Sequence, residues 1–155
     1  MILKETAIIG IWIIIGAVAL GGFDALGLLS PHEAGLASAI EVDLPEVYRI
    51  WREKEAIFVD SRPSAAFKRT HIPGAVNVPL GTLKQVADTL SRLSIGRDES
   101  VILYCSGAHC PNAHQLMFLF LRLGYRNVRV FSRGLEIWKV LGYPLEKDGR
   151  NGRRS

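Results

Sequence analysis

The chain contains little cysteine: its 155 residues include only two, Cys105 and Cys110. Two cysteines are too few for the several disulfides that hold small secreted domains together, so that class of protein is excluded. An oxidising compartment would permit a Cys105–Cys110 bridge without requiring one. The length suits one domain with a short appendage.

The chain also lacks a basic stripe with interleaved aromatic residues, the usual pattern of a nucleic-acid-binding surface. Its formal net charge is +4, of which residues 147–155 hold +3, leaving +1 for the rest of the chain. We therefore expect no nucleic-acid partner. Residues 147–155 are expected to form a solvated, disordered basic tail.

Charge is absent altogether from Ala7 to Phe23, a run of seventeen residues. This run is just long enough to span a bilayer, for which about 20 residues are typical. It exceeds the roughly 7–15 residues of a signal-peptide core, which favours an uncleaved transmembrane anchor within residues 1–30. A cleaved signal peptide is the alternative, because Ala17-Val18-Ala19 matches a small-x-small cleavage pattern.

The charges on either side of this run predict its orientation. Lys4 precedes the run, and no Lys or Arg follows it before Arg49. The positive-inside rule then places the N-terminus in the cytoplasm and a single-pass domain on the exported, periplasmic or extracytoplasmic side. If the segment is cleaved, the domain would be secreted. Residues 31–39 are interpreted as a linker.

From residue 40 onward there is no internal repeat, and short apolar stretches alternate with helical patterns. The predicted strands are residues 40–42, 56–60, 75–78, 101–104 and 127–131. The predicted helices are residues 45–53, 82–93, 111–123 and 135–141, with a turn after the second strand. This alternation predicts an α/β fold in which helices cover both faces of a mostly parallel sheet.

The strand predicted at 101–104 leads directly into Cys105 and a loop of small residues. Pro111 suits the first turn of the next helix. Ligands of open α/β sheets bind at the carboxyl ends of the strands. Unpaired N–H groups of the loop and helix start would favour negative charge on the sulfur and lower the pKa of the Cys105 thiol. The alternative is an inert buried thiol.

Five short motifs accompany this cysteine. They are Asp60-Ser61-Arg62; His71-Ile72-Pro73-Gly74-Ala75; Tyr104-Cys105; Gly124-Tyr125 with Asn127-Val128; and Gly134, Trp138, Gly142 and Pro144. In this order they make residues 40–146 resemble a single-domain rhodanese, a sulfurtransferase-like module. The resemblance implies a rhodanese-like parallel sheet with helices on both faces.

The resemblance also implies a reaction that uses no cofactor and no metal. Cys105 would attack the outer sulfur of a small donor, hold it as a persulfide, and pass it to a thiol or another nucleophilic acceptor. The implied active-site loop consists of Ser106, Gly107, Ala108, His109 and Cys110. Small residues there allow N–H groups to point inward, as in an anion-binding nest, and so stabilise a negatively charged persulfide.

Two departures from the family pattern concern the donor. Tyr125 lies twenty residues after Cys105, where the family has eighteen, so the loop or helix start is two residues longer. The family's loop arginine is missing, and Cys110 or Asn112 takes its place, depending on where the insertion falls. Loss of this bidentate anion clamp disfavours thiosulfate. A wider loop favours a polysulfide or a persulfide-bearing protein.

The second cysteine has two interpretations. Cys110 could resolve a persulfide or sulfenate on Cys105 by forming a disulfide, or it could simply cap the helix before Pro111. His109 and His114 could act as general acids, but solvent-facing positions are the alternative. No zinc site is expected, because a site of Cys105, His109 and Cys110 would need a fourth ligand that the local sequence does not offer.

Asp60, Arg62 and His71 are interpreted as supports of the loop, through an Asp–Arg pair and a turn histidine. Arg62 could also supply the positive charge that the loop lacks. The leading hypothesis is a membrane-tethered sulfurtransferase. The alternatives are thiol–disulfide exchange through the two cysteines, oxyanion chemistry of the phosphatase or arsenate-reductase kind, and a non-catalytic binding module.

Overall fold

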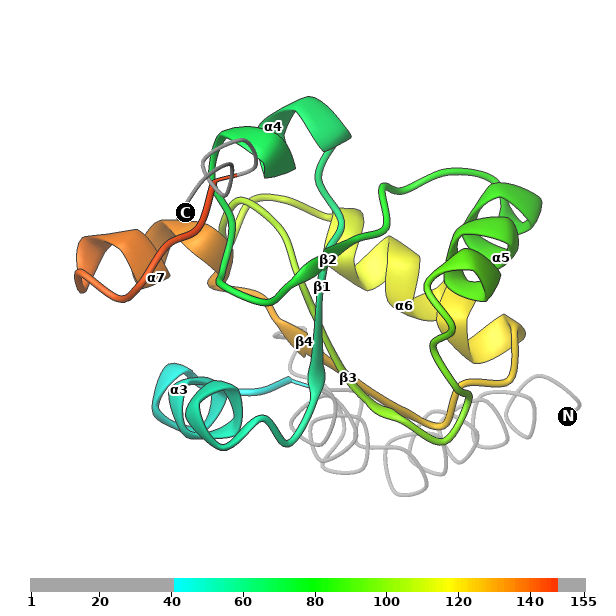
Figure 1. The fold of residues 1–155 in the computed structure, drawn as a ribbon, viewed down its shortest axis with the longest axis horizontal. Coiled ribbons are helices and arrows are strands. Elements are labelled where there is room, and N and C mark those ends of the chain that lie inside the picture. The colour runs from blue at the N-terminus through cyan, green and yellow to red at the C-terminus, as the bar shows by residue number, and fades with distance from the viewer. Residues whose placement is uncertain (1–40, 148–155) are drawn as a thin grey trace, which may run out of the picture. The chain divides into compact units, whose positions relative to one another are not determined.

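A computed structural model describes residues 41–147 (Figure 1). Its centre is a parallel sheet of four strands in the order β2-β1-β3-β4. The strands are β1 (Ile57–Asp60), β2 (Val76–Asn77), β3 (Ser100–Tyr104) and β4 (Asn127–Phe131). The predicted parallel sheet is therefore confirmed.

The strand predicted at residues 40–42 is wrong within the described part of the chain. Glu41 forms only an isolated parallel bridge with Val130, and the N–H of Val42 donates to the Val130 carbonyl at 3.0 Å. The extended segment ends because Asp43 caps the next helix, its side chain accepting a hydrogen bond from the N–H of Glu46.

Five helices surround the sheet within residues 41–147. They are α3 (Leu44–Glu53), α4 (Ser64–Arg69), α5 (Leu83–Arg92), α6 (Asn112–Arg122) and α7 (Gly134–Val140). Helix α4 stands where the sequence predicted only a turn. It has six residues, and Phe67 is the only buried one, so no helical periodicity is visible in its sequence.

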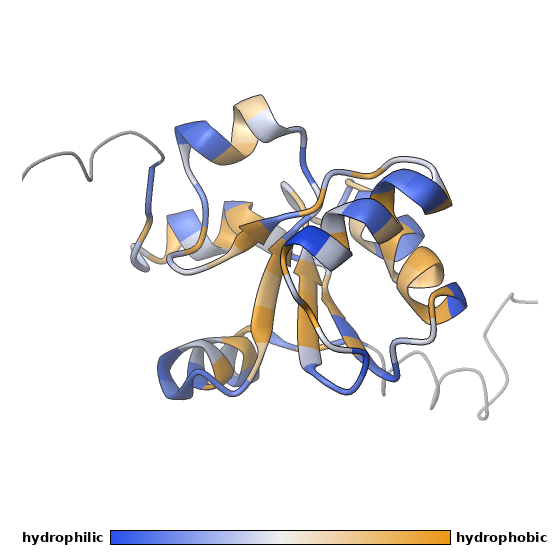
Figure 2. Cartoon of the chain, turned by 45° about the vertical axis from the view of Figure 1, so that its right-hand side comes forward, coloured by the Kyte–Doolittle hydropathy of each residue, from blue (hydrophilic) through white to orange (hydrophobic). Residues whose placement is uncertain are grey.

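Alternate strand residues point to opposite faces of the sheet, and each face has its own core. On one face Val59, Leu103 and Val130 pack with residues of α5 and α6. On the other, Phe58, Ile102 and Phe131 pack with residues of α3, α4 and α7. Figure 2 shows the resulting hydrophobic strands at the centre of the domain. Both faces of the sheet are therefore covered, as expected of parallel strands.

No helix within residues 41–147 has the length and apolar character needed to cross a membrane. The predicted anchor and linker precede the described residues, and all of the predicted tail after residue 147 follows them.

Candidate active site

Cys105 directly follows β3, at the carboxyl edge of the sheet where the sequence places it. Its side chain is buried, with 3% of the residue exposed. Strand β1 pairs with β3 so that Asp60 lies opposite Tyr104, the residue before the cysteine. The ends of these two neighbouring strands therefore form the candidate site.

The loop after Cys105 folds back on itself. A disulfide joins Cys105 to Cys110, with the two Cα atoms 6.1 Å apart. The N–H of Cys110 donates to the Gly107 carbonyl at 3.0 Å. Cys110 itself is half-buried, so the two sulfurs belong to residues of different exposure.

Between the cysteines, Ser106, Ala108 and His109 are exposed, whereas Gly107 is buried. Within residues 41–147, the backbone N–H groups of residues 106–109 have no hydrogen-bond acceptor. The N–H of Cys110 is occupied by the turn to Gly107, whereas the N–H groups of residues 112–114 at the start of α6 also have no acceptor among residues 41–147.

The first turn of helix α7 is hydrogen-bonded to the start of the loop. The N–H of Leu135 donates to the Cys105 carbonyl at 2.9 Å, and the N–H of Glu136 donates to the Ser106 carbonyl at 2.8 Å. This approach requires glycine at position 134, where φ is +56° and a Cβ would lie 2.5 Å from the Cys105 carbonyl oxygen. Sequence reasoning found Gly134 as part of a motif but missed the contact of Glu136.

Gly107 lies against the side chain of Glu136. A Cβ at Gly107 would lie 2.5 Å from a carboxylate oxygen of Glu136 and 3.3 Å from its Cβ. A side chain at position 107 would therefore require the flexible Glu136 side chain to move.

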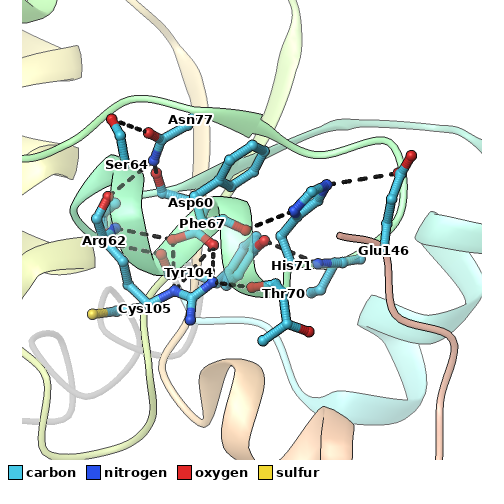
Figure 3. A network of polar contacts seen from close by, with 12 residues as sticks. Asp60, Arg62, Ser64, Phe67, Thr70, His71, Asn77, Tyr104, Cys105 and Glu146 are labelled. Atoms are coloured by element: carbon cyan, nitrogen blue, oxygen red, sulfur yellow. Dashed lines mark hydrogen bonds and ion pairs between the residues drawn. The ribbon is translucent and has the colours of Figure 1, made fainter. Parts of the chain in front are cut away.

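A buried ion pair between Asp60 and Arg62 occupies the end of β1 (Figure 3). Nε and Nη2 of Arg62 donate to the carboxylate at 2.6–3.1 Å, and Nη2 also donates to the Thr70 carbonyl at 2.6 Å. Asp60 is fully buried, and 7% of Arg62 is exposed. This bidentate geometry compensates the charge that burial would otherwise leave unpaired.

Asn77 binds the backbone of the same two residues, a contact that was not expected from the sequence. Its Nδ2 donates to the carbonyls of Asp60 at 3.0 Å and Arg62 at 2.9 Å. Its Oδ1 accepts a hydrogen bond from Ser64 at 2.8 Å. No local sequence signal identifies this residue, because its partners come from other segments.

Tyr104, the last residue of β3, has a fully buried side chain. Its hydroxyl accepts a hydrogen bond from the N–H of Ile72 at 3.2 Å. Burial, followed by the negative charge of Asp60, raises the pKa of Tyr104 far above its ordinary value. The hydroxyl therefore stays neutral. The sequence identified Tyr104 only as a strand residue.

His71 is turned toward the C-terminal segment of the domain. Its ring stacks on Phe67 at 3.8 Å, and Nδ1 lies 2.9 Å from the Phe67 carbonyl oxygen. Its backbone forms an antiparallel bridge with Glu146, whose carboxylate lies 3.7 Å from Nε2. Figure 3 shows the ring directed toward Glu146.

The remaining predicted residues lie around the start of α6. His109 is exposed on the loop, and Asn112 is half-buried as the first residue of the helix. His114 is half-buried, and its Nε2 lies 3.1 Å from a carboxylate oxygen of Glu41. His114 therefore contacts the segment before α3.

Lys139, in the last turn of α7, is a further residue that sequence reasoning did not consider. Partial burial and then the positive charge of Arg62 lower its pKa. The negative charge of Asp60, the partner of Arg62, acts in the opposite direction on the pKa of Lys139.

The Rhodanese-like domain model matches residues 43–141, so the chain belongs to the rhodanese-like domain family. The chain is 32% identical over 130 residues to an HTH-type transcriptional regulator of Mycobacterium tuberculosis, covering 84% of this chain and 51% of that protein. It is also 32% identical over 92 residues to the adenylyltransferase and sulfurtransferase UBA4 of Saccharomyces cerevisiae, covering 52% and 20%. The match thus spans about half or less of these relatives.

Among solved structures, the BH2092 protein of Bacillus halodurans has the same fold. It is 28% identical, with a TM-score of 0.63, over 76% of this chain and 87% of that one. The relatives thus include a sulfurtransferase and a protein named as a regulator, so the family alone does not define a reaction.

Proposed function

We propose that this protein is a sulfurtransferase that moves sulfane sulfur through a persulfide on Cys105. The observation that carries the proposal is the position of Cys105: it ends a buried strand beside four backbone N–H groups that have no acceptor among residues 41–147. Such donors stabilise an anionic sulfur. Membership of the rhodanese-like family supports the same chemistry.

The reaction begins from the reduced chain, because only a free thiolate is a nucleophile. The Cys105 thiolate attacks the outer sulfur of the donor. A new sulfur–sulfur bond forms at Cys105 while the bond inside the donor breaks, and the remainder of the donor leaves with the electron pair of that bond. An acceptor thiolate then attacks the outer sulfur of the persulfide and restores the Cys105 thiolate.

The proposed donor is a polysulfide or a persulfide-bearing protein. The loop from Cys105 to Cys110 contains no arginine, so a sulfonate group has no bidentate partner there. Ser106, Ala108 and His109 leave the outer side of the loop exposed, and this openness is consistent with a donor larger than thiosulfate.

Mass spectrometry of the reduced, full-length chain tests the proposal. The C110S variant is used because its Cys105 persulfide cannot be lost to a disulfide with residue 110. After incubation of this variant with polysulfide, the peptide containing Cys105 should gain about 32 Da, and cyanide should then remove that mass as thiocyanate. The C105S variant is the control and should gain nothing. Absence of the adduct with polysulfide, thiosulfate and a protein persulfide would overturn the proposal.

The Cys105–Cys110 disulfide favours thiol–disulfide exchange as a second candidate function. In that case the protein would pass its disulfide to substrate dithiols without any sulfane sulfur. A thiol-trapping assay on a reduced model substrate separates the two functions, because exchange requires no sulfur donor.

The proposal includes a membrane tether on the exported side, for which the uncharged run Ala7–Phe23 is the support. Carbonate-washed membranes of the expressing cell should retain the full-length chain. Recovery of the chain, uncut, in the soluble fraction would refute the tether, and a shortened soluble chain would indicate signal cleavage.

A further inference from the structure

The two cysteines of this chain are placed to react with one another. They are its only cysteines, and the structure joins them. Their Cα separation of 6.1 Å falls in the ordinary disulfide range of roughly 4.4–6.8 Å. In the reduced chain, the Cys110 sulfur can therefore reach the sulfur of Cys105.

The surrounding backbone holds both residues in this arrangement. Leu135 and Glu136 fix the start of the loop through hydrogen bonds to the carbonyls of residues 105 and 106. The turn from Gly107 to Cys110 fixes its end, immediately before α6. These contacts belong to the backbone, so they do not require the sulfur–sulfur bond.

We propose that Cys110 resolves the Cys105 persulfide, releasing hydrosulfide and making the protein a sulfane-sulfur reductase. This inference rests on the proposed persulfide chemistry. The Cys110 thiolate attacks Sγ of Cys105, forming the Cys105–Cys110 bond. The bond from Cys105 to the outer sulfur breaks, and that sulfur leaves with its electron pair and one proton as hydrosulfide. The sulfane sulfur is reduced, and the two cysteines are oxidised to the disulfide.

The next turnover requires a thiol reductant, and a protein dithiol is the class that fits. Cys110 is half-buried and Cys105 is 3% exposed, so an incoming thiolate meets the Cys110 sulfur first. Attack there makes Cys105 the leaving thiolate, beside the unpartnered N–H groups of residues 106–109. The second thiol of the reductant then resolves its mixed disulfide with Cys110.

A single-turnover experiment on the reduced, full-length chain tests this step in the absence of oxygen and of added thiol. The chain receives stoichiometric polysulfide, and hydrosulfide and intact mass are measured together. Both wild type and C110S release the remainder of the donor when the persulfide forms. Wild type should release about one further hydrosulfide per chain and end about 2 Da lighter, with both thiols lost. C110S should keep the added mass of about 32 Da and lack this further release. C105S gives the background release from polysulfide.

A protein dithiol such as reduced thioredoxin should then allow repeated release by wild type. C110A repeats the test with a second side chain, and circular dichroism verifies that each variant is folded. The resolving step is overturned if wild type keeps its persulfide as C110S does, or if both C110S and C110A release the further hydrosulfide at the wild-type rate. If no Cys105 persulfide forms in either Cys110 variant, the proposed sulfur transfer itself fails.

Discussion

The two strand ends that form the candidate site are built in opposite ways. At the end of β1, Asp60 and Arg62 are buried and bound to each other, and Asn77 and the Thr70 carbonyl bind them as well. At the neighbouring end of β3, the loop after Cys105 is largely exposed, and its N–H groups at residues 106–109 have no acceptor among the described residues.

The difference fits the proposed function. A buried charge is stable only with its partner, so the end of β1 tolerates little change. In the proposed sulfur transfer, the end of β3 binds a transient anion, so its donors must stay available. One strand end would then act as a fixed support, and its neighbour would hold the reactive group.

The largest effect is expected from breaking the support at β1. D60A leaves the Arg62 guanidinium buried without its carboxylate, which should lower the free energy of unfolding by about 3–5 kcal/mol. Urea denaturation measures the change. The control is D98A, which removes the exposed partner of Arg126 and should leave stability nearly unchanged. Equal effects of the two substitutions would contradict the distinction between a fixed end and an exposed surface.

The second prediction concerns the contact between helix α7 and the loop at the end of β3. G134A places a Cβ 2.5 Å from the Cys105 carbonyl oxygen at a positive φ, which should cost on the order of 1–3 kcal/mol and displace the loop. G142A is the matched control: its φ is also positive, +70°, but no atom lies within 4 Å of the added Cβ. Only G134A should slow persulfide formation in the folded variant. A similar loss of rate in G142A would show that the contact between position 134 and the Cys105 carbonyl is not the cause of the slower persulfide formation.

The third prediction concerns Tyr104, the buried tyrosine that ends β3. Burial raises the pKa of Tyr104, so the folded chain keeps a proton that the unfolded chain loses above about pH 10. This contribution to stability is therefore complete below that pH and declines as pH rises above it. Denaturation of wild type between pH 9 and 11 should show the decline.

Y104F should reduce that decline, and at neutral pH it should cost about 1 kcal/mol through the lost hydrogen bond from Ile72. Y143F, at a half-buried tyrosine whose ring stacks on that of Tyr48, serves as the control. An unchanged pH slope in Y104F would show that Tyr104 does not couple proton release to unfolding.

The smallest effect is expected from H114A. His114 contacts Glu41 in a pair with both side chains more than a third exposed, so its loss should change stability by no more than about 0.5 kcal/mol. Persulfide formation by H114A should equal that of wild type. A marked fall in its rate would place His114 in the reaction and extend the reactive region beyond the loop.

Much of the sheet was predictable because β1 and β3 carry continuous apolar runs and β4 alternates apolar Val128 and Val130 with polar residues. The helices α5 and α6 were expected within one residue at each end, since both carry apolar residues at helical spacing. Helix α4 and the bridge at Glu41 were missed or misjudged. Helix α4 is too short for its sequence to show helical periodicity. The extended segment at Glu41 stops early because Asp43 caps helix α3, and this cap was not recognised in the sequence.

By itself, the sequence determined the order of the four sheet strands and of helices α3, α5, α6 and α7, the place of Cys105 at a strand end, and the presence of a second cysteine five residues later. These are local properties, carried by side-chain periodicity and spacing. Only the tertiary structure decided which groups meet: Asn77 with Asp60, Glu136 with the loop, Ile72 with Tyr104, and Cys110 with Cys105. Such contacts depend on how separate segments pack, and distances between packed segments are not encoded in any local pattern.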